Sequence, residues 1–217
     1  MARRPAAGGG RWVEVDPARL PRWLDGFGQR HGSSEANVSG ATVRLVAADG
    51  CVAELHAPPG ASEPTGLDDL VASAMLARRL GLLLARQSAV AAGVADGERL
   101  ISSKVDSSYV QGRTAAGGWS QHRFARRREN QARAAAGEAA DIAARVLLPE
   151  AGRLAAVVTG GNRRAVDAIL TDPRLAAVAA LRSDRFLDVA EPRLAVLERA
   201  VAAARAVRIR VLDEPSG

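Results

Sequence analysis

Residues 117–131 read GGWSQHRFARRRENQ, a diglycine that runs into a glutamine and then into an arginine-rich segment. Two neighbouring glycines allow the backbone to adopt conformations, and to approach a ligand, in ways that residues with side chains cannot. Five arginines follow within about four turns of predicted helix: Arg123, Arg126, Arg127, Arg128 and Arg133. The stretch predicts an exposed glycine loop that leads into a long basic helix.

The positive charge of the chain is concentrated around this stretch. Residues 104–133 contain seven basic residues and two acidic ones, a net charge of +5, and the whole chain carries +6. A run of charged residues is usually a solvated helix face. The concentration of nearly all the net charge in one segment instead favours contact with RNA, whose phosphates attract arginine.

Length and composition predict a domain that folds without disulfide bonds or structural metal ions. A chain of 217 residues with 47% hydrophobic residues can bury a sizeable core. The single cysteine, Cys51, excludes an internal disulfide and a cysteine-rich zinc site. His31, His56 and His122 are scattered and show no metal-ligand spacing. We therefore expect no metal and no cofactor.

No targeting or membrane signal stands out in the sequence. The N-terminus, MARRPAAGGG, leads into Arg11 and Trp12 instead of an apolar signal core. No later apolar run approaches about 18 residues. We expect a cytoplasmic monomer that does not contact a membrane.

The first part of the chain predicts a small α+β arrangement. Asp16 and Pro17 suit a helix cap and first turn, and an apolar stripe follows. Residues 32–40 break this helix. Residues 41–47 and 52–56 alternate apolar and polar side chains around the turn Ala48-Asp49-Gly50, which predicts a hairpin. A second helix is expected over residues 67–80.

The remaining chain alternates strand and helix patterns. Three strands joined by tight turns are expected at residues 81–86, 89–94 and 99–105, followed by an exposed loop at 107–118. A long helix then ends near Pro149. The expected elements after it are a strand at 154–159, a helix at 162–170 capped by Asn162, a strand at 185–189, a helix at 192–204 and a strand at 207–212. Such alternation predicts a mixed α/β sheet with crossover helices.

The glycine loop offers neither an activated nucleophile nor a pair of carboxylates, the groups that an ordinary hydrolase needs. Glutamine is no base near neutral pH, but its carbonyl and amide can orient a water or a sugar hydroxyl. Backbone amides nearby can stabilise a developing oxyanion. Such a tip works best when it is inserted into a site built by another molecule.

Residues 104–131 resemble the catalytic domain of archaeal and eukaryotic class-one peptide release factors, in which GGQ is followed by serine and then by Arg-Phe. Gly117, Gly118, Ser120, Arg123 and Phe124 match that pattern. Trp119 departs from it, because it stands in the place of the release-factor glutamine. The sequence is more similar to the bacterial Vms-like release factors, relatives of the Vms/ANKZF ribosome-quality-control proteins, whose glutamine comes later in a GxxQ-type loop. Gly118 and Gln121 fit that spacing.

The resemblance implies an α/β fold: a release-factor-like, RNase H-like mixed sheet with flanking helices and a protruding glycine loop before the long basic helix. It gives the domain organisation that we expect. Residues 1–11 form a disordered tail, residues 12–79 an α+β extension packed on the core, and residues 80–217 the catalytic domain.

The resemblance also implies the function: cleavage of peptidyl-tRNA on a stalled ribosome or 50S subunit, without a cofactor. The catalytic residues it implies are Gln121, Gly117, Gly118 and Ser120. The RNA-binding residues it implies are Trp119, His122, Arg113, Arg123, Arg126, Arg127 and Arg128. Ester hydrolysis is the expected chemistry. The alternatives are cleavage of the tRNA near its 3′ CCA end, as in the eukaryotic Vms relatives, and a non-catalytic RNA-binding module.

Two further features of the sequence have both a structural and a functional interpretation. Trp119 can fold onto the core or stack on a base. Gly160-Gly161-Asn162 looks like an anion-binding helix start but lacks a phosphate-loop lysine, so we interpret it as a turn and cap.

Overall fold

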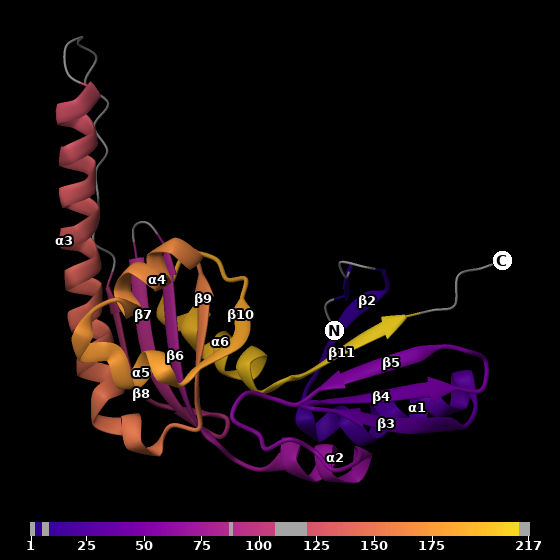
Figure 1. Ribbon diagram of the computed structural model, residues 1–217. Coiled ribbons are helices and arrows are strands. Elements are labelled where there is room, and N and C mark those ends of the chain that lie inside the picture. The colour runs from indigo at the N-terminus through magenta and orange to yellow at the C-terminus, as the bar shows by residue number, and fades with distance from the viewer. Residues whose placement is uncertain (1–2, 6–8, 87–88, 107–120, 213–217) are drawn as a thin grey trace. The chain divides into compact units, whose positions relative to one another are not determined.

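The computed structural model describes residues 3–5, 9–86, 89–106 and 121–212, and at residues 3–5 and 121–133 it describes the backbone alone (Figure 1). The chain divides into two compact units. Unit 1 comprises residues 1–77 and 202–217, and unit 2 comprises residues 78–201. Each unit has its own sheet and its own hydrophobic core.

Unit 1 is built on an antiparallel sheet of strand order β1-β2-β11-β5-β4-β3. The strands are β1 (Arg3–Pro5), β2 (Arg11–Val15), β3 (Ser34–Ser39), β4 (Thr42–Ala47), β5 (Val52–His56) and β11 (Val207–Leu212). The β4–β5 pair confirms the predicted hairpin.

The helices of unit 1 contribute to one core with its sheet. They are the 3-10 turn η1 (Pro17–Arg19), α1 (Leu20–His31) and α2 (Leu67–Met75). Leu20, Phe27 and Leu70 are buried with the apolar side chains of the strands. The Asp16 carboxylate accepts a hydrogen bond from the Ala18 amide at 2.9 Å, as expected of a cap.

Two expectations for this unit are wrong, and one strand was not predicted. Arg3–Pro5 is not a disordered tail, because it pairs with β2. The first helix does end before residues 32–40, as predicted, but Ser34–Ser39 within them is a strand. All six of its side chains are exposed, so no apolar alternation marks it. Helix α2 ends at Met75 instead of residue 80, because Leu76 is extended and the following apolar residues enter the next strand.

Strand β11 corrects the expected boundary of the catalytic domain. Residues 80–217 were assigned to one domain, but β11 lies between β2 and β5 in the sheet of unit 1. Its alternation is as predicted, with Val207, Ile209 and Val211 buried. Alternation identifies a strand but does not specify its partner, which here lies about 150 residues away in the sequence.

Unit 2 is built on a mixed sheet of strand order β10-β9-β6-β7-β8. Its strands are β6 (Arg79–Arg86), β7 (Ala89–Asp96), β8 (Arg99–Asp106), β9 (Ala156–Gly161) and β10 (Arg182–Leu187). Strands β6, β7 and β8 form an antiparallel meander, and β9 and β10 run parallel to β6. The predicted α/β class with a mixed sheet and flanking helices is confirmed.

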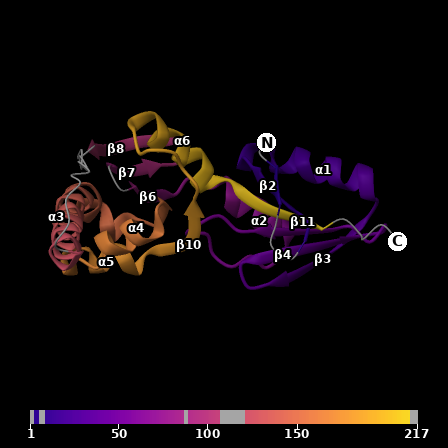
Figure 2. The ribbon, with the colours of Figure 1, turned by 90° about the horizontal axis from the view of Figure 1, so that it is seen from above.

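Helices cover both faces of this sheet. They are α3 (Gln121–Leu147), η2 (Leu148–Arg153), α4 (Arg163–Leu170), η3 (Pro173–Leu175), α5 (Ala176–Ala180) and α6 (Leu194–Arg205). Figure 2 shows α3, α4 and α5 on one side of the strands and α6 on the other. Buried side chains of α3, α4 and α5 form one cluster with Leu83, Val94 and Val157 of the sheet.

Glycine permits close packing at two positions of this sheet. A Cβ at Gly93 would lie 2.9 Å from Leu100 Cδ1 and 3.0 Å from Leu197 Cδ2, so its absence lets α6 approach β7. Gly161 has φ +96°, and a Cβ there would lie 2.2 Å from the carbonyl oxygen of Ala85. Gly161 is therefore needed for the turn from β9 into α4, where Asn162 caps the helix by accepting from the Ala165 amide at 3.0 Å.

Candidate functional site

The predicted site residues fall into two groups in the structure. Arg113, Gly117, Gly118, Trp119 and Ser120 lie outside the described residues. The remaining ones occupy the first turns of α3, where the backbone alone is described: Gln121, His122, Arg123, Arg126, Arg127 and Arg128. The structure thus makes Gln121 the first residue of a helix of 27 residues and places the predicted RNA-binding arginines just after it.

Helix α3 is anchored to unit 2 by its C-terminal third. Ala139 is the first buried residue of the described positions 134–147, and Ile142, Ala143, Val146 and Leu147 continue the buried stripe. This stripe belongs to the same core cluster as the strands. We call residues 139–147 the foot of α3.

The preceding residues 121–138 form an arm. Figure 1 shows α3 continuing well past the ends of the strands of unit 2. At about 1.5 Å per helical residue, this arm is roughly 27 Å long. Its described positions 134–138 are exposed or half-buried. A helix of this length can carry its first residue deep into a partner.

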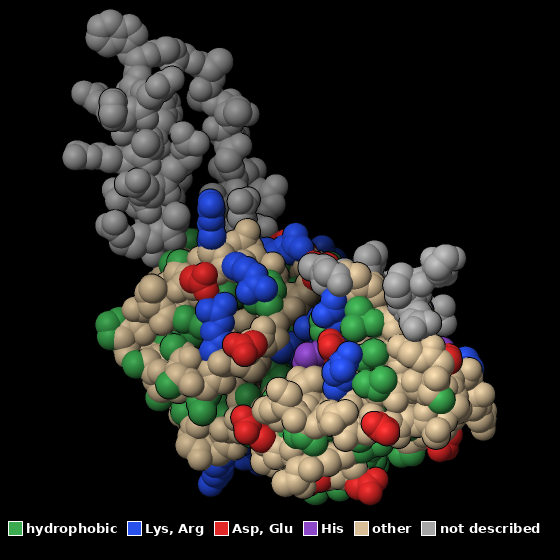
Figure 3. All heavy atoms as spheres, turned by 45° about the vertical axis from the view of Figure 1, so that its right-hand side comes forward, with side chains coloured by type: hydrophobic (Ala, Val, Ile, Leu, Met, Phe, Trp, Pro, Cys, Tyr) green, Lys and Arg blue, Asp and Glu red, His purple; other side chains and the backbone are tan. Residues whose placement is uncertain are grey.

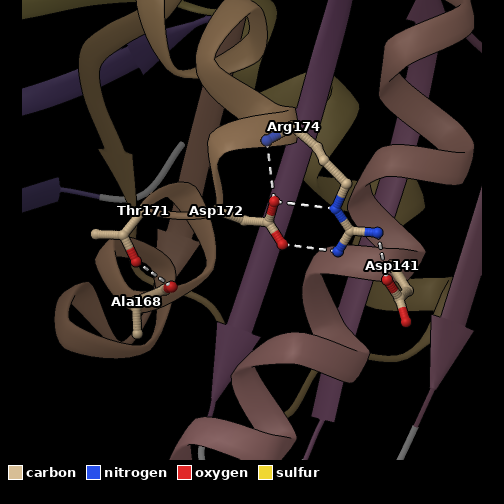
Figure 4. Close-up of polar contacts among 5 residues, drawn as sticks. All are labelled: Asp141, Ala168, Thr171, Asp172 and Arg174. Atoms are coloured by element: carbon tan, nitrogen blue, oxygen red, sulfur yellow. Dashed lines mark hydrogen bonds and ion pairs between the residues drawn. The ribbon is translucent and has the colours of Figure 1, made fainter.

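An arginine on the neighbouring turn holds the foot of α3 from the side (Figure 4). Arg174 donates to Asp141 of α3 at 2.8 Å and to Asp172 at 2.7 and 3.0 Å. These hydrogen bonds from Arg174, together with the Arg174 amide, lower the pKa of Asp172 from 3.8 to about 2. The same contacts raise the pKa of Arg174. The group joins η3 to α3, and the lowered pKa of Asp172 keeps that carboxylate ionised near neutral pH.

A second arginine holds the end of α3. Arg79, at the start of β6, donates to Glu150 of η2 at 2.8 Å and to Asp96 of β7 at 2.5 Å. Hydrogen bonds to Asp96 and Glu150 raise the pKa of Arg79. The segment that follows α3 is thereby attached to two strands.

Neither of these anchors was predicted from the sequence. Asp141 and Arg174 are 33 positions apart, and Arg79 and Glu150 are 71 positions apart. In the sequence alone they are isolated charged residues of the kind that most solvated surfaces carry. Pairing across such separations depends on the sheet order, which residue spacing does not reveal.

The described residues contain neither a cluster of metal ligands nor a membrane-spanning helix. Among the residues that the structure describes, no three His, Cys, Asp or Glu side chains gather as a metal site would require. Within the same described ranges, no helix is long and apolar enough to cross a membrane.

Residues 78–210 match a known protein family. The model of the acVLRF1 family, described as "Actinobacteria/chloroflexi VLRF1 release factor", matches residues 78–210. A solved structure titled "Archaeal protein" is similar with a TM-score of 0.40 and 16% sequence identity, over 74% of this chain and 52% of that one. The chain thus spans about half the length of that protein. The comparison with curated proteins gave no match.

Proposed function

Because the chain belongs to the Actinobacteria/chloroflexi VLRF1 release factor family, we propose that it is a ribosome-associated peptidyl-tRNA hydrolase that frees nascent chains from tRNA. Membership of a release factor family implies release-factor-like function and interaction with the ribosome. The finer assignment, hydrolysis of the peptidyl ester on a stalled ribosome or 50S subunit, is our proposal.

One observation carries this proposal: Gln121 begins a helix whose arm extends about 27 Å beyond the part that is packed on the sheet. An enzyme with a self-contained site holds its catalytic groups in a cleft. A glutamine at the end of a narrow arm suits a partner that supplies the rest of the site. The peptidyl transferase centre, which holds the ester of peptidyl-tRNA, is such a partner.

The proposed reaction is a simple hydrolysis. Gln121 orients a water molecule, whose oxygen attacks the carbonyl carbon of the ester that joins the peptide to the terminal ribose. The carbon–oxygen bond to the ribose breaks, the peptide leaves as a carboxylic acid, and the ribose hydroxyl keeps the second proton of the water. Backbone amides of residues 117–120 are proposed to stabilise the oxyanion. No metal or redox group takes part.

The first turns of α3 are proposed to hold the tip in place. Arg123, Arg126, Arg127 and Arg128 lie on one continuous helix, with spacings of three and four that put some of them on a common face. Arginine binds phosphate through charge and paired hydrogen bonds. Arg113, Trp119 and His122 complete the proposed RNA-contacting set. The proposal implies a cytoplasmic protein that works as a monomer.

The test is a release assay with both products analysed. Purified protein is added to 50S subunits that carry labelled peptidyl-tRNA, and the peptide and the tRNA 3′ end are examined together. We expect free peptide and a tRNA with an intact CCA end. A shortened CCA end with peptide still attached to nucleotides would mean nuclease action, and binding without either product would mean a non-catalytic module.

A further inference from the structure

Strand topology brings three arginines to one edge of the sheet of unit 2. Strands β6 and β9 are parallel and end side by side, since Ala85 pairs with Gly161. The Asn162 amide donates to the Ala85 carbonyl at 2.7 Å. Arg86 follows Ala85, and Arg163 follows Asn162, so two arginines that are 77 positions apart in sequence leave adjacent strand ends. Arg164 comes next, in the first turn of α4.

The contacts of these arginines hold them without neutralising them. All three residues are exposed. Arg86 Nε donates to the Val189 carbonyl oxygen at 2.9 Å. The Arg163 guanidinium lies over the Phe186 ring, 4.1 Å from its centroid. Within the described part of the chain, no ion pair to a carboxylate involves any of the three.

Three other arginines of unit 2 are paired with carboxylates. Arg79, Arg174 and Arg182 each contact one at 2.5 to 2.8 Å. Arg86, Arg163 and Arg164 have no carboxylate partner in the described structure, although Asp106 ends β8 and Asp188 follows β10 at the same edge. Three arginines beside two carboxylates leave a surplus of positive charge there.

This edge is the one from which the arm extends. Strand β8 is antiparallel to β7, as β6 is, so β6 and β8 both end there. Helix α3 then runs back along the sheet, so its arm points beyond this edge (Figure 1). Figure 3 shows Lys and Arg side chains grouped on the surface that faces the viewer. The N-terminus of α4 adds partial positive charge at the same place.

We propose that Arg86, Arg163 and Arg164 form a second RNA contact, which binds the phosphodiester backbone near the base of the arm. We call these three arginines of β6 and α4 the foot patch, which is distinct from the foot of α3. The inference rests on the proposed function, because it takes RNA as the partner. The arm and the foot patch would then contact RNA at two separate places, one along the arm and one near its base. The first grip delivers Gln121, and the second limits how deeply the arm enters.

The experiment compares two triple variants of the full chain. One carries Arg86→Gln, Arg163→Gln and Arg164→Gln. The matched control carries Arg22→Gln, Arg145→Gln and Arg199→Gln, which removes the same charge at exposed arginines elsewhere that make no ion pair in the described part of the chain. Binding to 50S subunits and to free deacylated tRNA is measured between about 50 and 200 mM salt.

We expect the foot-patch variant to bind 50S subunits at least tenfold more weakly than wild type and to lower the slope of log K against log salt by about 2 to 3. The control variant should lower the affinity for 50S subunits and the salt slope much less. Loss for 50S subunits alone would identify ribosomal RNA as the source of the phosphates, and a matching loss for free tRNA would identify tRNA. Equal binding by the foot-patch variant and wild type, or an equal loss in the control, would overturn the proposal.

Two further variants separate this contact from folding and from catalysis. The Arg164 side chain makes no hydrogen bond, ion pair or ring contact in the described structure, so Arg164→Glu should weaken binding without lowering the thermal midpoint. The foot-patch variant should lose affinity for 50S subunits, whereas Gln121→Ala should bind normally and lose release. Wild-type binding without any release would remove the proposed function and leave the foot patch standing.

Discussion

The Asp172 carboxylate takes part in the attachment of α3 to the rest of unit 2, because it shares Arg174 with Asp141. Arg174 donates to it through Nε, Nη2 and the backbone amide, and also reaches Asp141 of α3 (Figure 4). The pKa of Asp172 in the folded protein, about 2, lies below its ordinary value of 3.8. The folded state therefore binds fewer protons than the unfolded state between these two pH values, and stability rises with pH across that window.

We predict that Asp172→Asn lowers stability at neutral pH and that its difference from wild type shrinks as pH falls from about 4 to about 2. Above this window the wild-type carboxylate is ionised in both states and its pairing with Arg174 is fully present. Unfolding in urea across pH 2 to 7 measures the effect. Asp184→Asn, at an exposed carboxylate without an ion pair in the described structure, is the control. A difference that does not change with pH would contradict the prediction.

A backbone position gives a second residue-scale prediction. Gly161→Ala should destabilise the protein by roughly 2 kcal/mol or more, since it adds left-handed strain and a clash with the Ala85 carbonyl. Gly152→Ala is the matched change, because a Cβ there meets nothing within 4 Å and its φ is not in the left-handed region. Urea unfolding should separate the two variants clearly; similar midpoints would show that the β9–α4 turn can relax.

Elements were predictable where their pattern is local. The hairpin of unit 1, the meander of unit 2 and the long helix all follow from alternation, turn residues and a stripe at three and four. Strand β3 was missed because all of its side chains are exposed. The end of α2 was misplaced because Leu76 and Leu80 continue the apolar pattern while the backbone becomes extended. Local propensity does not show whether an apolar residue between a helix and a strand continues the helix or enters the strand.

At the scale of the element, the length of the arm segment 132–138 should matter more than its sequence. Deleting residues 132–138 removes close to two turns, so the foot keeps its face while the arm shortens by about 10 Å. We predict that this deletion abolishes peptide release and leaves the thermal midpoint within about 2 °C of wild type, since none of its described side chains is buried.

The control for this deletion keeps the length and changes the residues. Replacing residues 132–138 with an alanine- and glutamate-based helical sequence of equal length should preserve release. Full activity in the shortened protein would show that reach is not what the arm provides. Loss of activity in the length-matched replacement would point to specific contacts made by this segment.

At the scale of the whole molecule, sheet membership could not be predicted. Strand β11 matches its predicted pattern, yet it completes the sheet of unit 1 after the chain has passed through unit 2. The expected division at residue 80 was close to the start of unit 2, whereas the expected continuation to 217 was wrong. Such pairing depends on which distant segments bury their apolar side chains together, and the spacing of residues within a short stretch of sequence does not show this. Of the candidate site, the sequence placed Gln121 in the glycine loop just before the long helix, whereas the structure makes it the first residue of α3. The sequence did not show the anchors.

Truncation tests the role of β11. A chain that ends at residue 206 loses the strand between β2 and β5 and the buried side chains Val207, Ile209 and Val211. We predict that amide protection in β2, β4 and β5 then falls to the level of the unfolded chain, while β6 and β7 stay protected, because unit 2 has its own core. Hydrogen exchange read by mass spectrometry reports both sheets at once. Retained protection in β5 would contradict the assignment of β11 as a structural strand of unit 1.

We propose that Gln121 performs the chemistry at the end of the arm. The decisive quantity is the single-turnover rate of peptide release from peptidyl-tRNA on 50S subunits, with wild type, Gln121→Ala and Gln131→Ala compared at saturating protein. Gln131 lies on the same helix, ten positions further on. We predict a loss of roughly 100-fold or more for Gln121→Ala, with unchanged binding, and a rate near wild type for Gln131→Ala. An undiminished rate in Gln121→Ala would show that Gln121 does not carry the chemistry.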